Sequence, residues 1–252
     1  MNTRAFDSVP VAGGRPKPRD TGLTMVLDWG RPNAYLEDWL RLADEYVDIG
    51  KVAIGTGRFY PESYLREKVE IYRRHGVHPC PGGNFLEHAA AKGKAEEFLK
   101  AAADLGFEHV EVSNNRGLLP RAAIKGLIGK ARDHGFRVFG EVGSEVERTT
   151  VADMIRDIHD CLESGVEKVY VEATDLIENG QFDLGRARHL ASEVPLERLI
   201  FELAGWWVKG VDMFEVHRTM IRLVEQFGPS VNVGNVDLDD VLLLECVRRD
   251  LE

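Results

Sequence analysis

Acidic side chains recur near the ends of short apolar runs in this chain of 252 residues. The run VFGEVG places Glu141 among apolar neighbours, where an ionised carboxylate is costly unless it has a partner or a task. One acid of this kind is more often salt-bridged or solvated than functional. Other runs carry an acid at a corresponding place, namely Asp28, Glu111, Glu172 and Glu202. Several acids in register therefore favour a functional site.

Carboxylates that converge repel one another unless a cation lies among them. Ligation by oxygen alone suits Mg²⁺ rather than zinc, so we expect a magnesium site. Its expected ligands are Asp28, Glu141, Glu172 and Glu202. Lys51 stands directly before the apolar run VAIG and is the expected basic partner, although it could simply neutralise one of the acids. The expected catalytic residues are Lys51, Glu111 and Glu141.

Two glycine-containing stretches are candidates for binding a substrate. In PGGN, Gly82, Gly83 and Asn84 end a strand and open a helix, where exposed N–H groups can hold an anion, although paired glycines in a tight turn are commoner. In VNVGNV, residues 231–236, a glycine lies between two asparagines at the end of the last expected strand, which makes this stretch a second candidate for binding a substrate. The alternative is a plain turn followed by an aspartate cap. The expected substrate-binding residues are Gly82, Gly83, Asn84, Ser113, Arg58, Arg116, Asn232, Gly234 and Asn235.

The elements that must position these residues alternate regularly. Short β-branched runs that indicate strands are separated by longer segments of helical period, and strand starts follow one another at the spacing of one βα unit. The expected strands are 23–28, 51–55, 77–83, 109–113, 137–143, 168–173, 199–203 and 231–236. Eight units predict an α/β fold, a (β/α)8 TIM barrel, whose carboxyl strand ends surround one mouth. A doubly wound sheet is the alternative, but no glycine-rich dinucleotide fingerprint follows the first strand.

Composition and charge limit the partners and the location of the protein. A net charge of −10 argues against nucleic acid and anionic membranes as main partners. No segment approaches the roughly 18–20 apolar residues of a membrane span, and the first residues lack the apolar core of a secretory signal. Three cysteines without CxxC spacing predict neither disulfides nor zinc, which fits a reducing cytoplasm. We expect a flexible leader over residues 1–20 and one domain over 21–252; a homo-oligomer is left open.

Several of these stretches together resemble the phosphosulfolactate synthases, in order and from about residue 20 onward. The matching segments are GLTMVLDWG, GKVAIGTG, HPCPGGNFLEHA, GFEHVEVSNN, FGEVG, KVYVEA, LIFEL and FGPSVNVGNVDLDDVLLLECVR. The resemblance implies a magnesium-dependent (β/α)8 lyase that adds sulfite to phosphoenolpyruvate, giving phosphosulfolactate, an early intermediate of coenzyme M synthesis. Plant heat-stress-associated proteins look like relatives too, so a non-catalytic binding or stress role is an alternative.

The implied reaction gives the acids a task. Attack at C3 of phosphoenolpyruvate drives charge into the carboxylate, and a magnesium ion held by mouth carboxylates would stabilise that charge. A lysine ammonium would then protonate C2. Lys51 is the expected proton donor, because the lysines that commonly follow EVG in the family are here replaced by Ser144 and Glu145.

The chain departs from the family pattern at the expected mouth. Trp29 stands where the family usually has lysine, and Thr174 where it usually has arginine, while LAGWW replaces an alanine–proline pair. Three of the four departures, including the one after EVG, remove positive charge, which disfavours two anionic substrates. A related magnesium-assisted addition of another nucleophile to an enolpyruvate or similar acceptor is therefore an alternative. Trp206 and Trp207 would then form a stacking wall for a larger, less charged partner, although the pair could equally pack under a helix.

Overall fold

Eight parallel strands form a nearly closed cylinder in the computed structural model, which describes residues 5–251. Their hydrogen-bonded order is β3-β2-β1-β10-β9-β6-β5-β4, and the two edge strands, β3 and β4, lie against each other. The strands are β1 (Thr24–Asp28), β2 (Ile49–Val52), β3 (His78–Pro81), β4 (His109–Val112), β5 (Arg137–Val142), β6 (Val169–Val171), β9 (Leu199–Glu202) and β10 (Val233–Val236). The predicted TIM barrel is confirmed.

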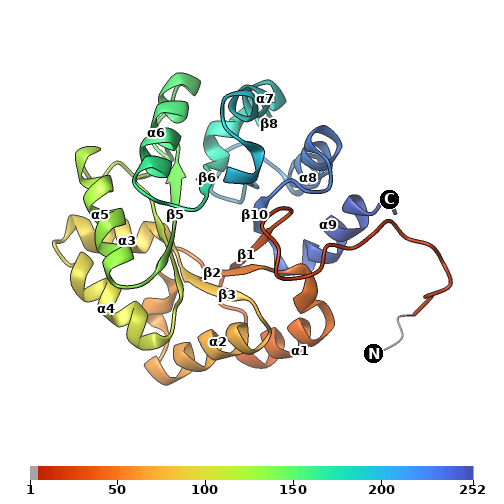
Figure 1. Ribbon diagram of the computed structural model, residues 1–252, viewed down its shortest axis with the longest axis horizontal. Helices are drawn as coiled ribbons and strands as arrows, with labels where there is room; N and C mark the ends of the chain where they lie inside the picture. Colours follow the sequence, from red (N-terminus) through yellow and green to blue (C-terminus); the bar gives the residue numbers. More distant parts are fainter. Residues whose placement is uncertain (1–4, 252) are drawn as a thin grey trace.

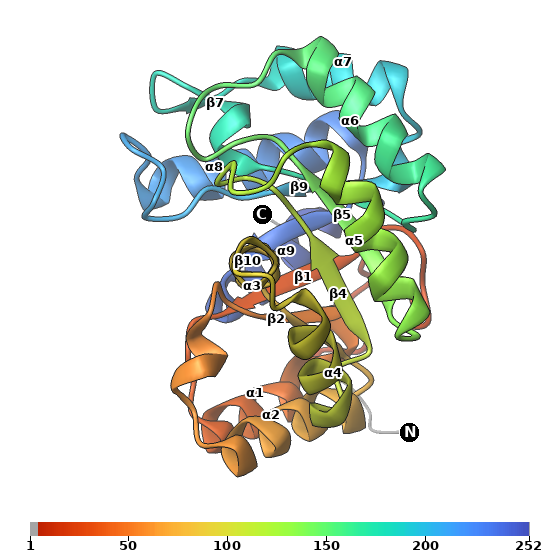
Figure 2. The same ribbon diagram turned by 90° about the vertical axis from the view of Figure 1, so that its left-hand side faces the viewer.

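Helices surround this cylinder (Figure 1), and Figure 2 shows α1 and α2 on the side of the strands opposite α6, α7 and α8. They are α1 (Asn33–Ala43), α2 (Glu62–Arg74), α3 (Gly83–Ala91), α4 (Ala95–Leu105), α5 (Ala122–Asp133), α6 (Val151–Glu163), α7 (Leu184–Glu193), α8 (Met213–Phe227) and α9 (Val241–Arg248). Side chains cap several of them: Thr150 accepts from the Asp153 amide at α6, and Asp212 from the Glu215 amide at α8. No helix within residues 5–251 is both long and apolar enough to cross a bilayer.

Alternation along each strand sorts side chains into two layers. In β1, Met25 faces the barrel interior, where it packs with Ile49 and Tyr170, whereas Val26 joins the larger core between strands and helices. Successive strand residues point to opposite faces, so residues two apart share a face. A functional side chain can therefore reach the mouth only from an inward-facing position.

Two local features differ from expectation. Strand β2 begins at Ile49, two residues before the expected start, because Ile49 and Gly50 already pair with β1. A small hairpin of β7 (Ile177–Glu178) and β8 (Gln181–Phe182), which sequence reasoning did not predict, lies between β6 and α7. Two helices, α3 and α4, lie between β3 and β4.

The segment that precedes β1 contacts the amino-terminal end of the barrel. Arg19 bonds to Asp48 at 2.9 Å, and Lys17 donates to the carbonyl of Gly76. Arg15 forms an ion pair with Glu245 in α9. Residues 1–4 of the expected leader lie outside the described residues, and the flexibility of the remainder stays a prediction.

Candidate active site

A cavity of about 430 Å³ occupies the carboxyl-terminal end of the barrel. We call it the mouth cavity. Every barrel strand, or the segment directly after it, contributes to its lining, which is the arrangement that places TIM-barrel active sites at this end. Its lining includes Leu27, Trp29, Lys51, Ile54, Gly82, Gly83, Asn84, Glu111, Arg116, Glu141, Glu145, Glu172, Glu202, Trp206, Trp207 and Asn235.

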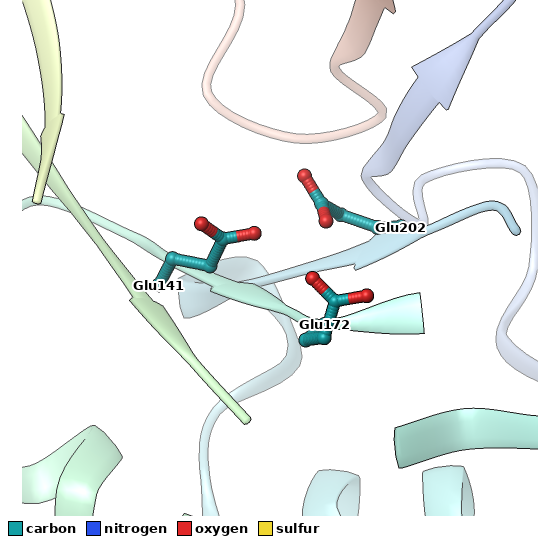
Figure 3. Close-up of side chains that lie close together, drawn as sticks. All are labelled: Glu141, Glu172 and Glu202. Atoms are coloured by element: carbon teal, nitrogen blue, oxygen red, sulfur yellow. The ribbon is translucent and has the colours of Figure 1, made fainter. Parts of the chain in front are cut away.

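Three buried glutamates converge in this cavity. Glu141 comes from β5, Glu172 directly follows β6 and Glu202 ends β9; Figure 3 shows their carboxylates turned toward one another. One oxygen of each lies within 4.8 Å of the others. This spacing suits a hard divalent cation after a small side-chain adjustment, because ligands about 2.1 Å from Mg²⁺ on opposite sides stand about 4.2 Å apart. All three side chains offer carboxylate oxygens, the ligand type that Mg²⁺ prefers.

Crowding shifts the ionisation of these glutamates. Burial, and then the charges of Glu111 and Glu202, raise the pKa of Glu141 well above its ordinary value. Burial and Glu202 raise the pKa of Glu172 to about 8. Burial also raises the pKa of Glu202, and the Lys51 ammonium only partly opposes that shift. The carboxylates are thus poorly compensated by the side chains around them.

Neighbouring polar groups fix the Glu172 carboxylate. Its Oε1 accepts hydrogen bonds from the Thr174 amide at 2.9 Å and the Thr174 hydroxyl at 3.0 Å. Its Oε2 accepts from the amide of buried Asn115, also at 3.0 Å. Groups that hold a ligand in this way orient it toward a metal. Sequence reasoning did not single out Asn115; its place two residues after Ser113, at the mouth end of β4, is the only available signal.

Lys51 lies at the centre of the acidic set. Its Nζ is 2.7 Å from Glu111 Oε2 and 2.9 Å from Glu202 Oε1, and it stands over the Tyr170 ring. Burial acts to lower the pKa of Lys51, but Glu111, Glu202 and Glu141 outweigh it and hold that pKa well above the ordinary value. Lys51 is therefore a protonated group in direct contact with one of the converging glutamates.

Glu111 holds two neighbours in place. Besides the Lys51 ammonium, it accepts a hydrogen bond from the Gly83 amide at 3.0 Å. Gly83 opens α3, directly after β3, so this contact bridges the two strands that close the barrel. A side chain at Gly83 has no room, because its Cβ would stand 2.3 Å from Glu111 Oε1. These contacts make Glu111 a positioning residue for Lys51.

The expectation that Asp28 joins the converging glutamates is wrong. It follows inward-facing Leu27 by one residue, so alternation turns it to the outer face of the sheet. There its Oδ2 accepts from Lys68 at 2.6 Å and from the Tyr72 hydroxyl at 3.0 Å. Its Oδ1 accepts from the amides of Gly30 and Arg31. Asp28 is therefore paired with the buried Lys68 ammonium and lies outside the mouth cavity.

The expected substrate-binding residues divide between the mouth and other places. Gly82, Gly83, Asn84, Arg116 and Asn235 line the cavity. Asn235 adopts φ 55°, and its buried Oδ1 has no hydrogen-bond partner among residues 5–251, so this amide is available to a ligand.

Four expected residues lie elsewhere, which corrects those predictions. Asn232 precedes β10 at the opposite end of the barrel, where it bonds the backbones of Leu23 and Leu199. Arg58 lines a neighbouring, more apolar hollow beside α2–α4, which shares Ile54 and Gly82 with the mouth cavity. Ser113 is buried beneath the start of α3, and a Cβ at Gly234 would meet Met25 and Glu202 inside the barrel; neither residue lines the cavity.

Other cavity residues were missed by sequence reasoning or were noted without a site role. Glu145, in the loop after β5, accepts from Asn84 at 3.0 Å and so links two loops across the rim. Ile54, after β2, has φ 50°, a left-handed conformation that is a genuine outlier for a β-branched residue. Its backbone lies 2.7 Å from where a Gly82 Cβ would stand, which accounts for glycine there. Their only sequence signal is proximity to a strand end.

Comparison with known proteins agrees with this architecture. Heat-stress-associated protein 32 of Arabidopsis thaliana is 24% identical over 242 residues, covering 84% of this chain and 79% of that protein. A truncated 3-deoxy-D-arabino-heptulosonate 7-phosphate synthase from Thermotoga maritima superposes with a TM-score of 0.59 at 13% identity, covering 90% of this chain and 84% of that one; at that identity the likeness shows the fold alone.

Stronger matches cover nearly the whole chain. The phosphosulfolactate synthase of Methanocaldococcus jannaschii is 33% identical over 241 residues, which is 91% of this chain and 92% of that protein. A family model described as (2R)-phospho-3-sulfolactate synthase (ComA) matches residues 13–252. The chain therefore belongs to the phosphosulfolactate synthase family.

Proposed function

We propose that this protein is a lyase that adds a nucleophile to an enolpyruvate-type acid, assisted by Mg²⁺. In the reaction that the family implies, the nucleophile is sulfite and the acceptor is phosphoenolpyruvate. Family membership supports a lyase-type activity. The observation that carries the proposal is the convergence of Glu141, Glu172 and Glu202 beside a buried lysine in one cavity.

The three glutamates would hold the cation. When bound, Mg²⁺ supplies a positive charge that stabilises the developing negative charge on the substrate carboxylate. Asn115 and Thr174 keep the Glu172 carboxylate oriented toward that position. The three side chains are buried, and electrostatic interactions are stronger at a buried site than in bulk water.

Lys51 would supply the proton. The nucleophile forms a bond to C3 of the acceptor, the electron pair of the double bond moves toward C2 and the carboxylate, and C2 takes a proton from the Lys51 ammonium. A carbanion beside a carboxylate is a stronger base than an amine, so the raised pKa of Lys51 does not prevent this transfer. Glu111 holds the ammonium in place through a contact of 2.7 Å.

A direct experiment tests the reaction. The protein is incubated with phosphoenolpyruvate, sulfite and Mg²⁺, and phosphorus NMR follows the conversion of the enol phosphate to an alkyl phosphate. Magnesium-dependent conversion of phosphoenolpyruvate, or of another enolpyruvate-type acid tested in its place, is the expected result. No conversion with phosphoenolpyruvate or with any other enolpyruvate-type acid, together with no effect of Mg²⁺ on the thermal unfolding temperature, would leave a non-catalytic barrel as the better description.

Glu141→Gln tests the site itself. We expect the variant to unfold cooperatively like the parent but to lose Mg²⁺ binding by at least about a hundredfold in calorimetric titration, because one of three charged ligands is gone. Glu147→Gln, an exposed change in the loop after β5, is the matched control and should bind Mg²⁺ normally. Unchanged affinity in Glu141→Gln would remove Glu141 from the site.

A further inference from the structure

Three of the four tryptophans of this chain line the mouth cavity. Trp29 follows β1, and Trp206 and Trp207 follow β9. The ring of Trp29 lies 5.8 Å from that of Trp206 and 5.6 Å from that of Trp207, so the three rings form one cluster. Trp206 is 77% exposed. Packing of the barrel therefore does not require its ring surface, which remains open at the rim.

The charges of the same cavity disfavour a phosphoryl group. Among the described residues, its lining holds five glutamates, of which Glu145 is the one at the rim, against two cationic side chains. Lys51 is already shared between two of these glutamates, and Arg116 is exposed. The Gly83 amide at the start of α3, which could have met an anion, is occupied by Glu111. Phosphate sites are usually built from arginine, lysine and open backbone N–H groups.

The volume of the cavity also favours an acceptor larger than phosphoenolpyruvate. At about 430 Å³ it falls within the roughly 300–1,000 Å³ of pockets that bind drug-sized ligands. A three-carbon acid with a small nucleophile leaves much of that space unfilled. The tryptophan cluster borders the cavity at its rim, whereas the converging glutamates are buried.

We infer that the natural acceptor is a carboxylic acid of the enolpyruvate type that carries a planar aromatic ring and no phosphoryl group. This inference rests on the proposed function, since the acid end binds at the cation held by Glu141, Glu172 and Glu202. The ring extends to the rim and stacks on Trp206. Offset-stacked or tilted aromatic contacts stabilise such a pose without any charge on the ligand.

Titration with three probes tests the inference. Phenylpyruvate, pyruvate and phosphoenolpyruvate are each titrated calorimetrically in the presence of Mg²⁺. We expect phenylpyruvate to bind at least about tenfold more tightly than either of the others, and only with Mg²⁺. Phosphoenolpyruvate binding as tightly as phenylpyruvate would overturn the inference while leaving the proposed function in place. Absence of Mg²⁺ binding in a titration without any acid would instead refute the proposed function, and the inference with it.

Two variants test where the aromatic ring of the ligand binds. Trp39→Phe, in helix α1, removes the one tryptophan outside the cavity, so fluorescence of that protein reports on the cavity alone. Phenylpyruvate should change this fluorescence, and pyruvate should not. Trp206→Ala, at an exposed position, should weaken phenylpyruvate about tenfold while leaving Mg²⁺ affinity unchanged. Equal phenylpyruvate affinity in Trp206→Ala and the parent would overturn the assignment.

Discussion

Two clusters of buried charge lie near the carboxyl ends of the barrel strands, on opposite faces of the sheet. Behind β1, Asp28 meets Lys68 at 2.6 Å, one acid with one base, and two backbone amides complete its hydrogen bonds. Inside the barrel, Lys51 faces an acidic set of four, namely Glu111, Glu141, Glu172 and Glu202. The outer cluster is balanced, and the inner one is not.

The difference shows how a structural charge cluster can be told from a functional one. Asp28 and Lys68 are both fully buried, and each satisfies the other, so they need nothing from outside the protein. In the mouth, burial and mutual repulsion raise the pKa values of Glu141, Glu172 and Glu202, a state that a bound cation would relieve. Carboxylates with raised pKa values that converge in a cleft mark a candidate functional site.

Breaking the balanced cluster should give the largest loss of stability. Lys68→Met leaves the Asp28 carboxylate buried without its ammonium partner, and we expect a loss of about 3–5 kcal/mol in the free energy of unfolding. Urea denaturation followed by circular dichroism measures this loss. Mg²⁺ affinity, measured where the variant is folded, should stay within about twofold of the parent value.

The double variant Asp28→Asn/Lys68→Met is the control, because it removes both charges and should recover much of the lost stability. A single variant that unfolds like the parent, or one that loses Mg²⁺ binding, would contradict the separation of the two clusters.

Much of the fold follows from sequence pattern alone. Eight β-branched runs at βα spacing predicted all eight barrel strands, because their alternation with helical segments is a local property. The start of β2 was missed because Asp48 and Gly50 resemble turn residues, although Asp48 is instead buried against Arg19 and the Thr24 amide. That partnership is long-range, and no local signal carries it.

The site was predictable in outline and less so in detail. Acids near the strand ends correctly indicated the mouth. Asp28 was also assigned to the mouth, but it follows inward-facing Leu27 by one residue and therefore points to the outer face of the sheet. The face to which a strand residue points can be predicted only once the exact strand register is known, because a shift of one residue moves every side chain to the other face. The prediction for Asn232 was wrong because this residue begins the expected strand, whereas Asn235 lies near its end. The two asparagines therefore lie at opposite ends of the barrel.

The unbalanced cluster should make stability depend on pH in metal-free protein. Glu172 has a pKa of about 8 when folded and an ordinary glutamate pKa, near 4.3, when unfolded. Between those values the folded state binds more protons, so this group's contribution to the free energy of unfolding falls as pH rises, by up to about 1.4 kcal/mol per pH unit. Urea titrations between pH 6 and 8 in EDTA, compared with Glu172→Gln, isolate this contribution.

Added Mg²⁺ should oppose that fall, since the ligands must be ionised to bind it and its affinity should rise toward pH 8. If the free energy of unfolding of the metal-free parent depended on pH in the same way as that of Glu172→Gln, the pKa of Glu172 would be ordinary. The contrast between the two charge clusters would then weaken.

The smallest expected effect comes from disturbing the mouth cluster through its backbone support. Gly83→Ala places a Cβ 2.3 Å from Glu111 Oε1 and 2.9 Å from Ser113 Oγ, so Glu111 must move away from the Gly83 amide and from Lys51. We expect a loss of about 1–3 kcal/mol in urea denaturation, as overpacking of a buried site costs, with a lower turnover number. Gly129→Ala, in α5 with no atom near its new Cβ, is the matched control and should gain up to about 1 kcal/mol. Since the outer cluster is untouched in both variants, a Gly83→Ala protein as active and stable as the parent would mean that Glu111 does not hold Lys51 in its working position.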